Sequence, residues 1–399
     1  MSRTVQEINP RGGMETHGEL LLTGLAARGI RIEVITTRHP DGLLSLEKNG
    51  VHYHFLADCA TGAYSSTYFE KSTELLVERH TDQPFDAVLS QSGGAFGYVS
   101  RGRRRTLGVP VAYIMHGITP WELRSARAAV ARWRDWINVF RLFLVLVRER
   151  LLPAHSNADV DAMLAVSEEL ACAIRIEWPH LNERVYTVVN GVDSELFRPD
   201  PEGGRSLRTT HGIGDEEVVV LMAGRLAREK GCHLALQALS RLAMKDSVRL
   251  VIAGTGPERE RLERASRELG LSARVLFLGH VEWSLLPRWY AACDLFLLPT
   301  LRWEGLPMSV VEALSCGRPV IASRIGGVPS AVMDGVTGEL IEAGDTEALT
   351  EALARMVADP RRRMEMGHAA REDAKSRLSQ ERMVEQTIEV LRRIVGKDA

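Results

Sequence analysis

The sequence has few cysteines, no long apolar run and almost no net charge. Its five cysteines are scattered without a CxxC pair, which fits reduced thiols in a cytosolic protein and argues against a disulfide framework or a zinc site. No apolar run reaches the roughly 18 residues of a membrane span, and no secretory signal is recognisable. The net charge of −2 gives no general attraction to nucleic acid. These absences predict a cytoplasmic chain without a nucleic-acid partner.

The length of 399 residues is enough for two domains with ample cores. Both halves alternate short apolar runs with helical segments, a pattern typical of parallel sheets covered on both faces. A polar stretch rich in Pro and Gly, residues 199–204, is the best linker candidate. We therefore predict domains at 1–198 and 199–375, followed by a helical segment at 376–399. Strands are expected at 4–8, 31–36, 51–56, 87–90, 109–115, 162–166, 185–189, 218–223, 248–253, 275–278, 295–298 and 320–322.

Two glutamates stand eight residues apart at the start of a predicted buried helix. Glu304 lies in the loop before this helix, and Glu312 lies near its second turn. Pro307 suits the first helical position because its missing N–H would have no partner there, and Gly317 ends the helix. A ligand at this helix end would meet backbone N–H groups and two carboxylates. Phosphate suits the N–H groups, whereas sugar hydroxyls, which are donors, suit the carboxylates.

The segment EGLPMSVVEALSCGRPVIAS, which contains this glutamate pair, resembles the signature of retaining, nucleotide-sugar-dependent glycosyltransferases of family 4. The resemblance implies the α/β GT-B fold, with two doubly wound Rossmann-like domains facing a central cleft. The first domain would bind the acceptor and the second the nucleotide sugar, and the last helix would cross back to the first domain. The implied reaction moves a sugar from a UDP-sugar or GDP-sugar to a hydroxyl of a sugar, glycolipid or small-molecule acceptor. The implied setting is cell-surface polysaccharide or glycolipid synthesis.

The same resemblance implies roles for residues of the second domain. Arg225 and Lys230, in the block GRLAREKG, would neutralise the diphosphate leaving group as its negative charge develops. With these cations in place, no metal and no other cofactor is expected. Glu304 would hold hydroxyls of the donor sugar, and Glu312 would accept hydrogen bonds from the ribose. Further donor contacts are expected from Gly254, Gly256, Leu278, Gly305, Leu306 and Pro307.

In the first domain, the resemblance covers a glycine-rich loop and one histidine. Gly13 belongs to GGMETH, which would open the first helix and face the donor. His116 ends a predicted strand and would orient the donor sugar. Asp159 and Asp161 imitate the metal-binding DxD of another glycosyltransferase fold, but they precede a buried strand, and we reject that interpretation. No cluster of His, Cys and Asp has metal-ligand spacing.

The segment from Trp121 to Leu152 interleaves seven arginines with aromatic and aliphatic residues. A basic helix of this kind can lie in an anionic membrane surface, which would make the protein peripheral on the inner face of the membrane. The alternative is a domain helix packed on its sheet, with arginines that reach out to water.

Three other functions remain open at this point. A nucleotide-sugar epimerase on the same fold would act without an acceptor. A non-catalytic binding protein could descend from such a transferase, although the cations and glutamates argue against it. A nicotinamide-dependent dehydrogenase ranks last, because Arg259 stands where the third glycine of GxGxxG would follow Gly254 and Gly256.

Overall fold

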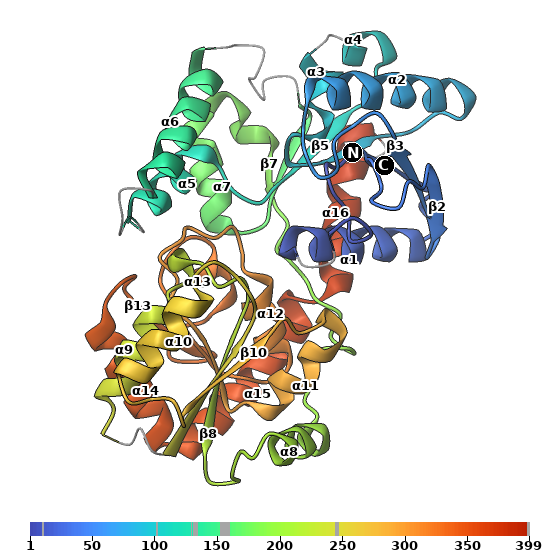
Figure 1. Ribbon diagram of the computed structural model, residues 1–399. Helices are drawn as coiled ribbons and strands as arrows, with labels where there is room; N and C mark the ends of the chain where they lie inside the picture. Colours follow the sequence, from blue (N-terminus) through green and yellow to red (C-terminus); the bar gives the residue numbers. More distant parts are fainter. Residues whose placement is uncertain are drawn as a thin grey trace. The chain divides into compact units, whose positions relative to one another are not determined.

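The computed structural model describes residues 1–9, 12–100, 103–128, 130, 135–151, 160–243 and 247–396. The chain divides into two compact units (Figure 1). Unit 1 comprises Met1–Thr119, Phe143–Gly191 and Gln380–Ala399, and unit 2 comprises Pro120–Leu142 and Val192–Ser379. Each unit combines helices with parallel strands, which confirms the predicted α/β class.

Unit 2 is built on one six-stranded parallel sheet with the order β10-β9-β8-β11-β12-β13. Its strands are short apolar runs that are buried on both faces, as expected for a parallel sheet covered by helices. The five strands predicted for this half are confirmed, and β13 is additional. The strands are β8 (Val218–Ala223), β9 (Val248–Ala253), β10 (Val275–Gly279), β11 (Leu295–Leu298), β12 (Val320–Ser323) and β13 (Gly338–Ile341).

The helices of unit 2 begin at short polar caps. Asp200, Asp345 and Asp359 each accept a hydrogen bond from a backbone N–H in the first turn of the helix that follows. Within the predicted linker at 199–204, the chain enters a helix, because Asp200 caps it and Pro201 suits its first position. The helices are α8 (Pro201–Thr210), α9 (Cys232–Arg241), α10 (Arg259–Glu268), α11 (Leu286–Ala292), α12 (Met308–Ser315), α13 (Val328–Ala331), α14 (Thr346–Ala358) and α15 (Pro360–Arg377).

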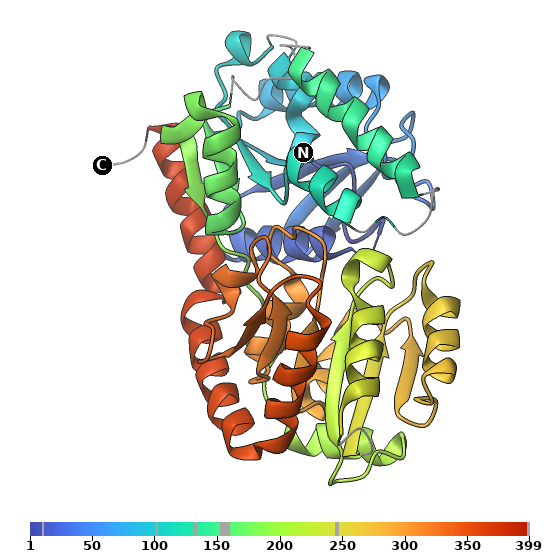
Figure 2. The same cartoon turned by 90° about the vertical axis from the view of Figure 1, so that its left-hand side faces the viewer.

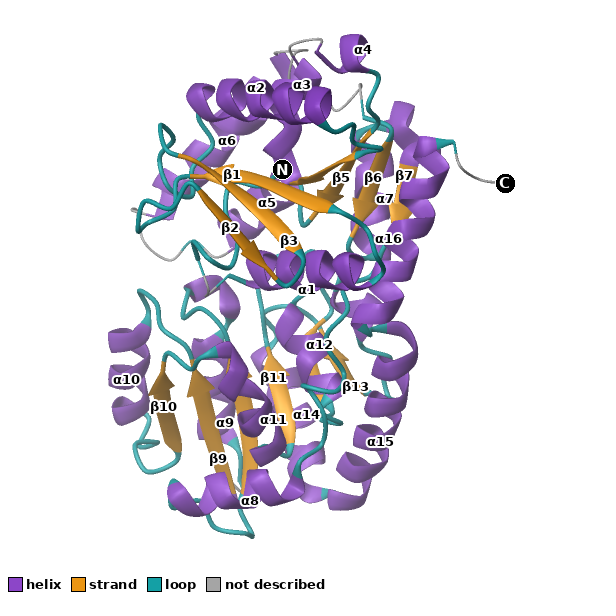
Figure 3. Cartoon of the chain, turned by 90° about the vertical axis from the view of Figure 1, so that its right-hand side faces the viewer, coloured by secondary structure: helices purple, strands orange, loops and turns teal. Residues whose placement is uncertain are grey.

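Unit 1 contains two separate sheets in place of the single parallel sheet that the sequence suggests (Figures 1 and 3). One has the order β1-β3-β2 and the other β4-β5-β6-β7. The strand predicted at 4–8 is wrong, because the amides of Ile8 and Asn9 both donate to the carbonyl of Val5 and close a turn. The strands are β1 (Ile32–Thr37), β2 (Ser45–Lys48), β3 (Val51–Leu56), β4 (Val88–Gln91), β5 (Val111–Met115), β6 (Ala162–Ala165) and β7 (Val185–Thr187).

The strand β2 was not predicted, and it runs antiparallel to β3. The two strands are joined by Asn49 and Gly50, which both have positive φ, at 52° and 75°. Positive φ at both central residues defines the tight hairpin turn that an Asn-Gly pair favours. The Asn-Gly pair was therefore the sequence signal for this hairpin.

The helices of unit 1 include the last one of the chain, α16, which packs against α1 and β6 (Figure 2, red). The Gln380 amide donates to the carbonyl of Leu20 at 2.7 Å. A Cβ on Gly24 would lie 2.4 Å from a methyl of Val384, so the absence of a side chain lets the two helices approach closely. The helices are α1 (Gly13–Ala27), α2 (Ser66–Asp82), α3 (Phe96–Ser100), α4 (Arg103–Leu107), α7 (Glu168–Glu177) and α16 (Gln380–Val395).

Two helices, α5 (Thr119–Ala128) and α6 (Asp135–Leu151), occupy most of the basic segment. The predicted single long helix is thus two helices, and Arg132, Trp133 and Arg134 lie outside the described residues. In the described residues, no helix is both long and apolar enough to cross a membrane.

Candidate functional site

The carboxyl edge of the unit 2 sheet brings together most of the predicted site residues. In the sheet, β8 is followed on one side by β9 and β10, and the neighbouring β11 is followed on the other side by β12 and β13. The strand order therefore reverses between β8 and β11 (Figure 3). Ligands of open α/β sheets bind beyond the strand ends at such a reversal. Arg225 and Lys230 follow β8, and Glu304 follows β11. The predicted cations and the first glutamate therefore lie on the two sides of this point.

The loops at this edge are fastened to one another by backbone hydrogen bonds. The Leu226 amide donates to the carbonyl of Thr255 at 2.9 Å, and the Leu301 amide donates to that of Glu229 at 2.7 Å. A Cβ on Gly254 would lie 1.8 Å from the carbonyl oxygen of Gly224, so only glycine fits there. The glycine turn at 254–256 thus packs directly on the loop that carries Arg225.

Lys230 and Glu304 form an ion pair in this site. The Lys230 Nζ lies 2.6 Å from Glu304 Oε1, and the side chains are 24% and 13% exposed. The Thr300 hydroxyl donates to the same oxygen at 3.3 Å. Arg225 is exposed at the end of β8, and both cations line a small pocket at the ends of β8 and β9. The structure therefore holds one cation against the carboxylate and leaves the other facing solvent.

Contacts on both sides hold the loop that carries Glu304. On one side, the Gly327 amide donates to the Glu304 carbonyl at 2.8 Å. On the other, the indole of Trp121 stacks on that of Trp303 with 5.0 Å between the ring centroids. The Trp303 amide also donates to the Ser125 hydroxyl at 2.7 Å. Because Trp303 precedes Glu304 directly, helix α5 takes part in fixing the position of this carboxylate.

Glu312 lies on α12 and is only 4% exposed. The Tyr290 hydroxyl donates to its Oε2 at 2.8 Å, and the Trp283 indole N–H donates to its Oε1 at 3.1 Å. Burial raises the pKa of Glu312, and the hydrogen bonds from Tyr290 and Trp283 oppose this increase. Each carboxylate oxygen can accept more than one hydrogen bond, so this network leaves capacity for further donors.

The remaining predicted contacts of this unit surround the same edge. Gly305, Leu306 and Pro307 are buried and lead into α12, whose first intrahelical hydrogen bond runs from the Val310 amide to the Pro307 carbonyl. The N–H groups that precede this bond have no intrahelical acceptor. Leu278 lies in β10, next to the glycine turn, since the Gly254 amide donates to the carbonyl of Gly279.

The predicted site residues of unit 1 lie at the N-terminus of α1 and the end of β5. Gly13 is the first residue of α1. The His116 Nε2 lies 2.7 Å from the Gln91 Oε1, and its ring meets that of His17 edge-on at 4.8 Å between centroids. Burial lowers the pKa of His116 to about 4 and lowers that of His17 well below its ordinary value. Both imidazoles are therefore neutral at pH 7.

The rejected metal motif has a structural role in the described part of the chain. Asp161 forms an ion pair with Arg104 and accepts a hydrogen bond from the Val111 amide at 2.7 Å. Asp159 lies outside the described residues. Among the residues that the structure describes, no group of three His, Cys, Asp or Glu side chains is placed to hold a metal ion.

Several residues that shape the site were missed by the sequence analysis. Trp283, Tyr290 and Thr300 contact the two glutamates, and Trp303 is stacked on Trp121. For Thr300 and Trp303, a signal existed, because both stand within four residues of Glu304. Trp283 and Tyr290 come from segments 22 to 29 residues before Glu312, and nothing in their local sequence indicates a buried carboxylate as partner.

Two family models match the chain in succession. "Glycosyltransferase Family 4" matches residues 11–196, and "Glycosyl transferases group 1" matches residues 205–373. The fold and the site define a doubly wound α/β protein with cations and carboxylates gathered at one sheet edge of unit 2. The chain belongs to the group 1 glycosyltransferases of the GT-B fold.

Curated relatives and solved structures agree with this assignment. The chain is 38% identical over 188 residues to the GDP-mannose-dependent α-(1-6)-phosphatidylinositol monomannoside mannosyltransferase of Mycolicibacterium smegmatis, covering 45% of this chain and 49% of that protein. It is 32% identical over 268 residues to D-inositol 3-phosphate glycosyltransferase 1 of Catenulispora acidiphila, covering 61% and 63%. The first of these alignments thus spans about half of the relative's length.

Two solved structures match the whole fold. Sucrose-phosphate synthase of Thermosynechococcus elongatus has a TM-score of 0.79 at 21% identity, covering 100% of this chain and 99% of that one. HepE of Anabaena, solved in complex with UDP, has a TM-score of 0.75 at 21% identity, covering 98% of each chain. At these identities, the likeness establishes the fold alone.

Proposed function

We propose that this protein is a retaining glycosyltransferase that moves a sugar from a nucleoside-diphosphate sugar to a hydroxyl acceptor. The observation that carries the proposal is the grouping of Arg225, Lys230 and Glu304 at the strand-order reversal of unit 2, beside the N-terminus of α12. Cations and helix N–H groups bind phosphate, and a carboxylate accepts hydrogen bonds from sugar hydroxyls. A nucleotide sugar contains both kinds of group.

In the proposed reaction, Lys230 exchanges its ion pair with Glu304 for the diphosphate of the donor. This exchange frees a carboxylate oxygen of Glu304 for the sugar hydroxyls. The bond between the anomeric carbon and the phosphate oxygen breaks, and the acceptor oxygen bonds to that carbon on the same face. The acceptor proton passes to the departing phosphate oxygen. Arg225 and Lys230 act most strongly as negative charge develops on the leaving group, so we propose that no metal is required.

For the base and the sugar of the donor, the proposal names a broader class. The relative from M. smegmatis is named for GDP-mannose, and the HepE structure contains UDP. We propose that the donor is a UDP-sugar or a GDP-sugar, with the ribose at Glu312. The two relatives are named for inositol-containing acceptors, which favours a glycolipid or polyol acceptor and a role in cell-envelope synthesis.

Contact with an anionic membrane surface is part of the proposed function. Helix α6 exposes Trp136, Ile137, Phe140, Phe143 and Leu144, each with 49% to 63% of its surface accessible. The exposed Arg141 lies on the same helix. Aromatic and aliphatic side chains beside basic ones are typical of helices that lie in a membrane interface. Binding to anionic vesicles that weakens as salt is added would support this contact. Binding of an equal amount of protein to neutral vesicles would contradict it.

The decisive experiment combines ligand binding with product analysis. Thermal unfolding is followed with UDP, GDP, ADP and their common sugars, with magnesium and with EDTA. A ligand at about 100 times its Kd adds roughly 2.7 kcal/mol to the free energy of unfolding. We expect one nucleotide family to raise Tm equally in magnesium and EDTA. Replacement of Arg225 by Ala should abolish the shift, and an unchanged shift in that variant would refute the proposed site.

Incubation with the stabilising donor then separates a transferase from an epimerase. The transferase converts the donor to product only when an acceptor such as an inositol phosphate or a phosphoinositide is added, and it preserves the anomeric configuration. An epimerase changes the donor sugar without any acceptor. A donor that binds tightly but stays unchanged with every acceptor would favour the non-catalytic binding protein.

A further inference from the structure

Helix α5 comes from the first half of the sequence but packs in unit 2. It begins three residues after His116, within the part of the chain, 1–198, that was predicted to bind the acceptor. Residues 120–142 nevertheless group with unit 2, which carries Glu304. The stacking of Trp121 on Trp303 places α5 against the loop that leads to this carboxylate. Since the acceptor must reach the donor sugar proposed to lie at Glu304, the surface beside α5 is where we expect acceptor contacts.

This surface carries an excess of positive charge. Arg302 and Glu122 form an ion pair with 3.6 Å between Nη2 and Oε1, and their side chains are 39% and 41% exposed. Arg124 and Arg127 are exposed on α5, and neither forms an ion pair with another described residue. Three arginines thus stand against one glutamate. An ion pair as long and as exposed as that of Arg302 contributes little to stability, so Arg302 can exchange Glu122 for the anion of a ligand.

Two half-buried indoles adjoin these arginines. The guanidinium carbon of Arg124 lies 4.5 Å from the ring centroid of Trp121, which stacks on Trp303 with 24° between the ring planes. Stacking on the indole holds the guanidinium in place and leaves its N–H groups available to a ligand. The electron-rich face of an indole attracts the C–H groups of a polyol ring, and guanidinium groups form paired hydrogen bonds with phosphate. A molecule with both a polyol ring and a phosphate therefore fits this surface.

The surface is close to Glu304 but separate from the cations assigned to the diphosphate. The Thr300 hydroxyl accepts a hydrogen bond from the Arg302 amide at 3.1 Å and lies 3.3 Å from the Oε1 of Glu304. Two residues of chain span at most about 7 Å, so the backbone of Arg302 stays near that of Glu304. Arg225 and Lys230 come from a different loop, which follows β8. A second anion can therefore bind at Arg302 while the diphosphate occupies the other two cations.

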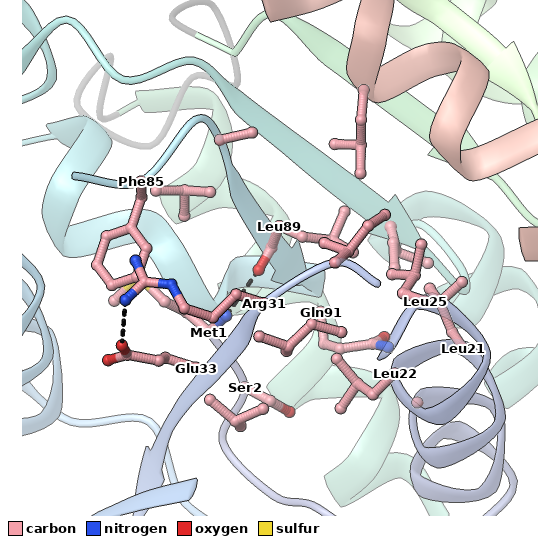
Figure 4. Close-up of a pocket in the computed structure, with 18 of the residues that line it drawn as sticks. Met1, Ser2, Leu21, Leu22, Leu25, Arg31, Glu33, Phe85, Leu89 and Gln91 are labelled. Atoms are coloured by element: carbon pink, nitrogen blue, oxygen red, sulfur yellow. Dashed lines mark hydrogen bonds and ion pairs between the residues drawn. The ribbon is translucent and has the colours of Figure 1, made fainter. Parts of the chain in front are cut away.

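The large cavity of unit 1 does not offer the same chemistry. It measures about 670 Å³, and leucines of α1 form part of its wall (Figure 4). Arg31, which also lines it, donates to Glu33 at 3.2 Å (Figure 4). Arg28 pairs with Glu385 at 3.3 Å. These two arginines already have carboxylate partners, so the cavity suits an anionic ligand less well than the surface at α5 does.

We propose that the surface formed by Trp121, Arg124, Arg302 and Trp303 binds the phosphate and the ring of a phosphorylated polyol acceptor. This inference rests on the proposed function and names its acceptor class. The phosphate accepts hydrogen bonds from Arg124 and Arg302, and the polyol ring lies against the exposed parts of the two indoles, with one hydroxyl directed to the donor sugar. A free polyol phosphate and the phosphodiester of a lipid headgroup present the same anionic oxygens, so the experiment includes both.

The test compares Arg124→Gln with Arg264→Gln, which makes the same change of charge on an exposed position of α10. Initial rates are measured with inositol 3-phosphate, with phosphatidylinositol in detergent micelles and with unphosphorylated myo-inositol. Arg124→Gln should raise the acceptor KM for a phosphorylated acceptor by about 10- to 100-fold, the effect of losing hydrogen bonds to a charged group. It should leave kcat/KM for myo-inositol and the donor KM within about twofold.

Two further variants and a binding measurement complete the test. Arg302→Gln should act like Arg124→Gln, Arg124→Lys should restore part of the affinity, and Arg264→Gln should change nothing. Calorimetric titration of the nucleotide-bound protein with inositol 3-phosphate measures the same site without turnover, and Arg124→Gln should weaken this binding by the same factor. Activity with inositol 3-phosphate or with phosphatidylinositol alone identifies the source of the phosphate.

An equal increase in KM for all three acceptors would overturn the proposal, because Arg124 would then only support the loop. Unchanged KM values together with weaker binding of Arg124→Gln to anionic vesicles would also overturn it and would assign α5 to a membrane surface. Failure of inositol 3-phosphate and phosphatidylinositol to bind would have the same consequence. If the proposed function itself were wrong, the wild-type protein would show no increase in Tm with any nucleotide sugar, whereas failure of this inference leaves that increase intact.

Discussion

Replacement of Lys230 by Met separates the stability role of the Lys230–Glu304 ion pair from its proposed catalytic role. The variant removes the charge and keeps a similar side-chain length. In the ligand-free protein, it leaves Glu304, which is 13% exposed, with the Thr300 hydroxyl at 3.3 Å. In the donor complex, it removes a cation from the diphosphate. The two effects are measured by different assays, so each can be tested by itself.

The expected loss of stability follows from the burial of the pair. Exposed ion pairs contribute about 0.2–1 kcal/mol, whereas breaking a buried pair costs about 3–5 kcal/mol. With side chains 24% and 13% exposed, we expect a loss of about 1–2 kcal/mol in the free energy of unfolding. This corresponds to a decrease of about 2–8 °C in the Tm of a unit of this size.

The expected loss of activity is larger. A preorganised group that stabilises developing charge typically contributes about 10²–10³ in kcat. We therefore expect Lys230→Met to lower kcat by about 10²–10³, and Lys230→Arg to retain much more of it. Arg228→Met makes the same change of charge two residues away and is the matched control. It should leave kcat within about twofold, in line with the small effects of most surface substitutions.

The double variant Lys230→Met with Glu304→Gln completes the cycle. It removes both charges, so it should recover most of the stability that Lys230→Met loses, while activity stays low. A Lys230→Met enzyme that loses stability but keeps a near-normal kcat would refute the proposed role of Lys230. In that case, the ion pair would be purely structural.

Three further predictions concern other parts of the two units. Glu312→Gln can keep the hydrogen bond from Trp283 and can donate from its amide to the hydroxyl of Tyr290. We therefore expect a loss of only about 1 kcal/mol in the free energy of unfolding, but weaker UDP or GDP binding by calorimetry. His116→Asn should flatten the pH dependence of stability. Between pH 6.5 and about 4, the unfolded state binds a proton that buried neutral His116 does not, so the free energy of unfolding falls by up to about 3 kcal/mol as the pH falls. The Tm of the variant should therefore change less over this range. Trp121→Ala removes the ring stacked on Trp303 and should raise the donor KM with little change in Tm; an unchanged KM would show that α5 does not position the Glu304 loop.

The site of unit 2 was largely predictable because its residues follow strands in short, ordered loops. In a parallel sheet, the carboxyl ends of neighbouring strands meet at one edge, so Arg225 and Lys230 after β8 had to approach Glu304 after β11. Their pairing in the ligand-free protein was not predictable, because it depends on the loop conformation. The contact between Glu312 and Tyr290 could not be predicted from the sequence either, because the two residues meet only through packing of α11 on α12.

The structure of unit 1 differs more from the prediction, because sequence patterns describe neighbouring residues, whereas strand pairing joins residues that are far apart in the chain. Every strand of both sheets except β2 was found from its apolar run, and the hairpin at Asn49 and Gly50 had a clear turn signal. The predicted strand at 4–8 failed because its apolar pattern is weak, and Val5 instead closes a turn. No local pattern could reveal that the backbone groups of Met1 and Ser2 bond to Leu89 and Gln91 of β4 and to Ile35 of β1.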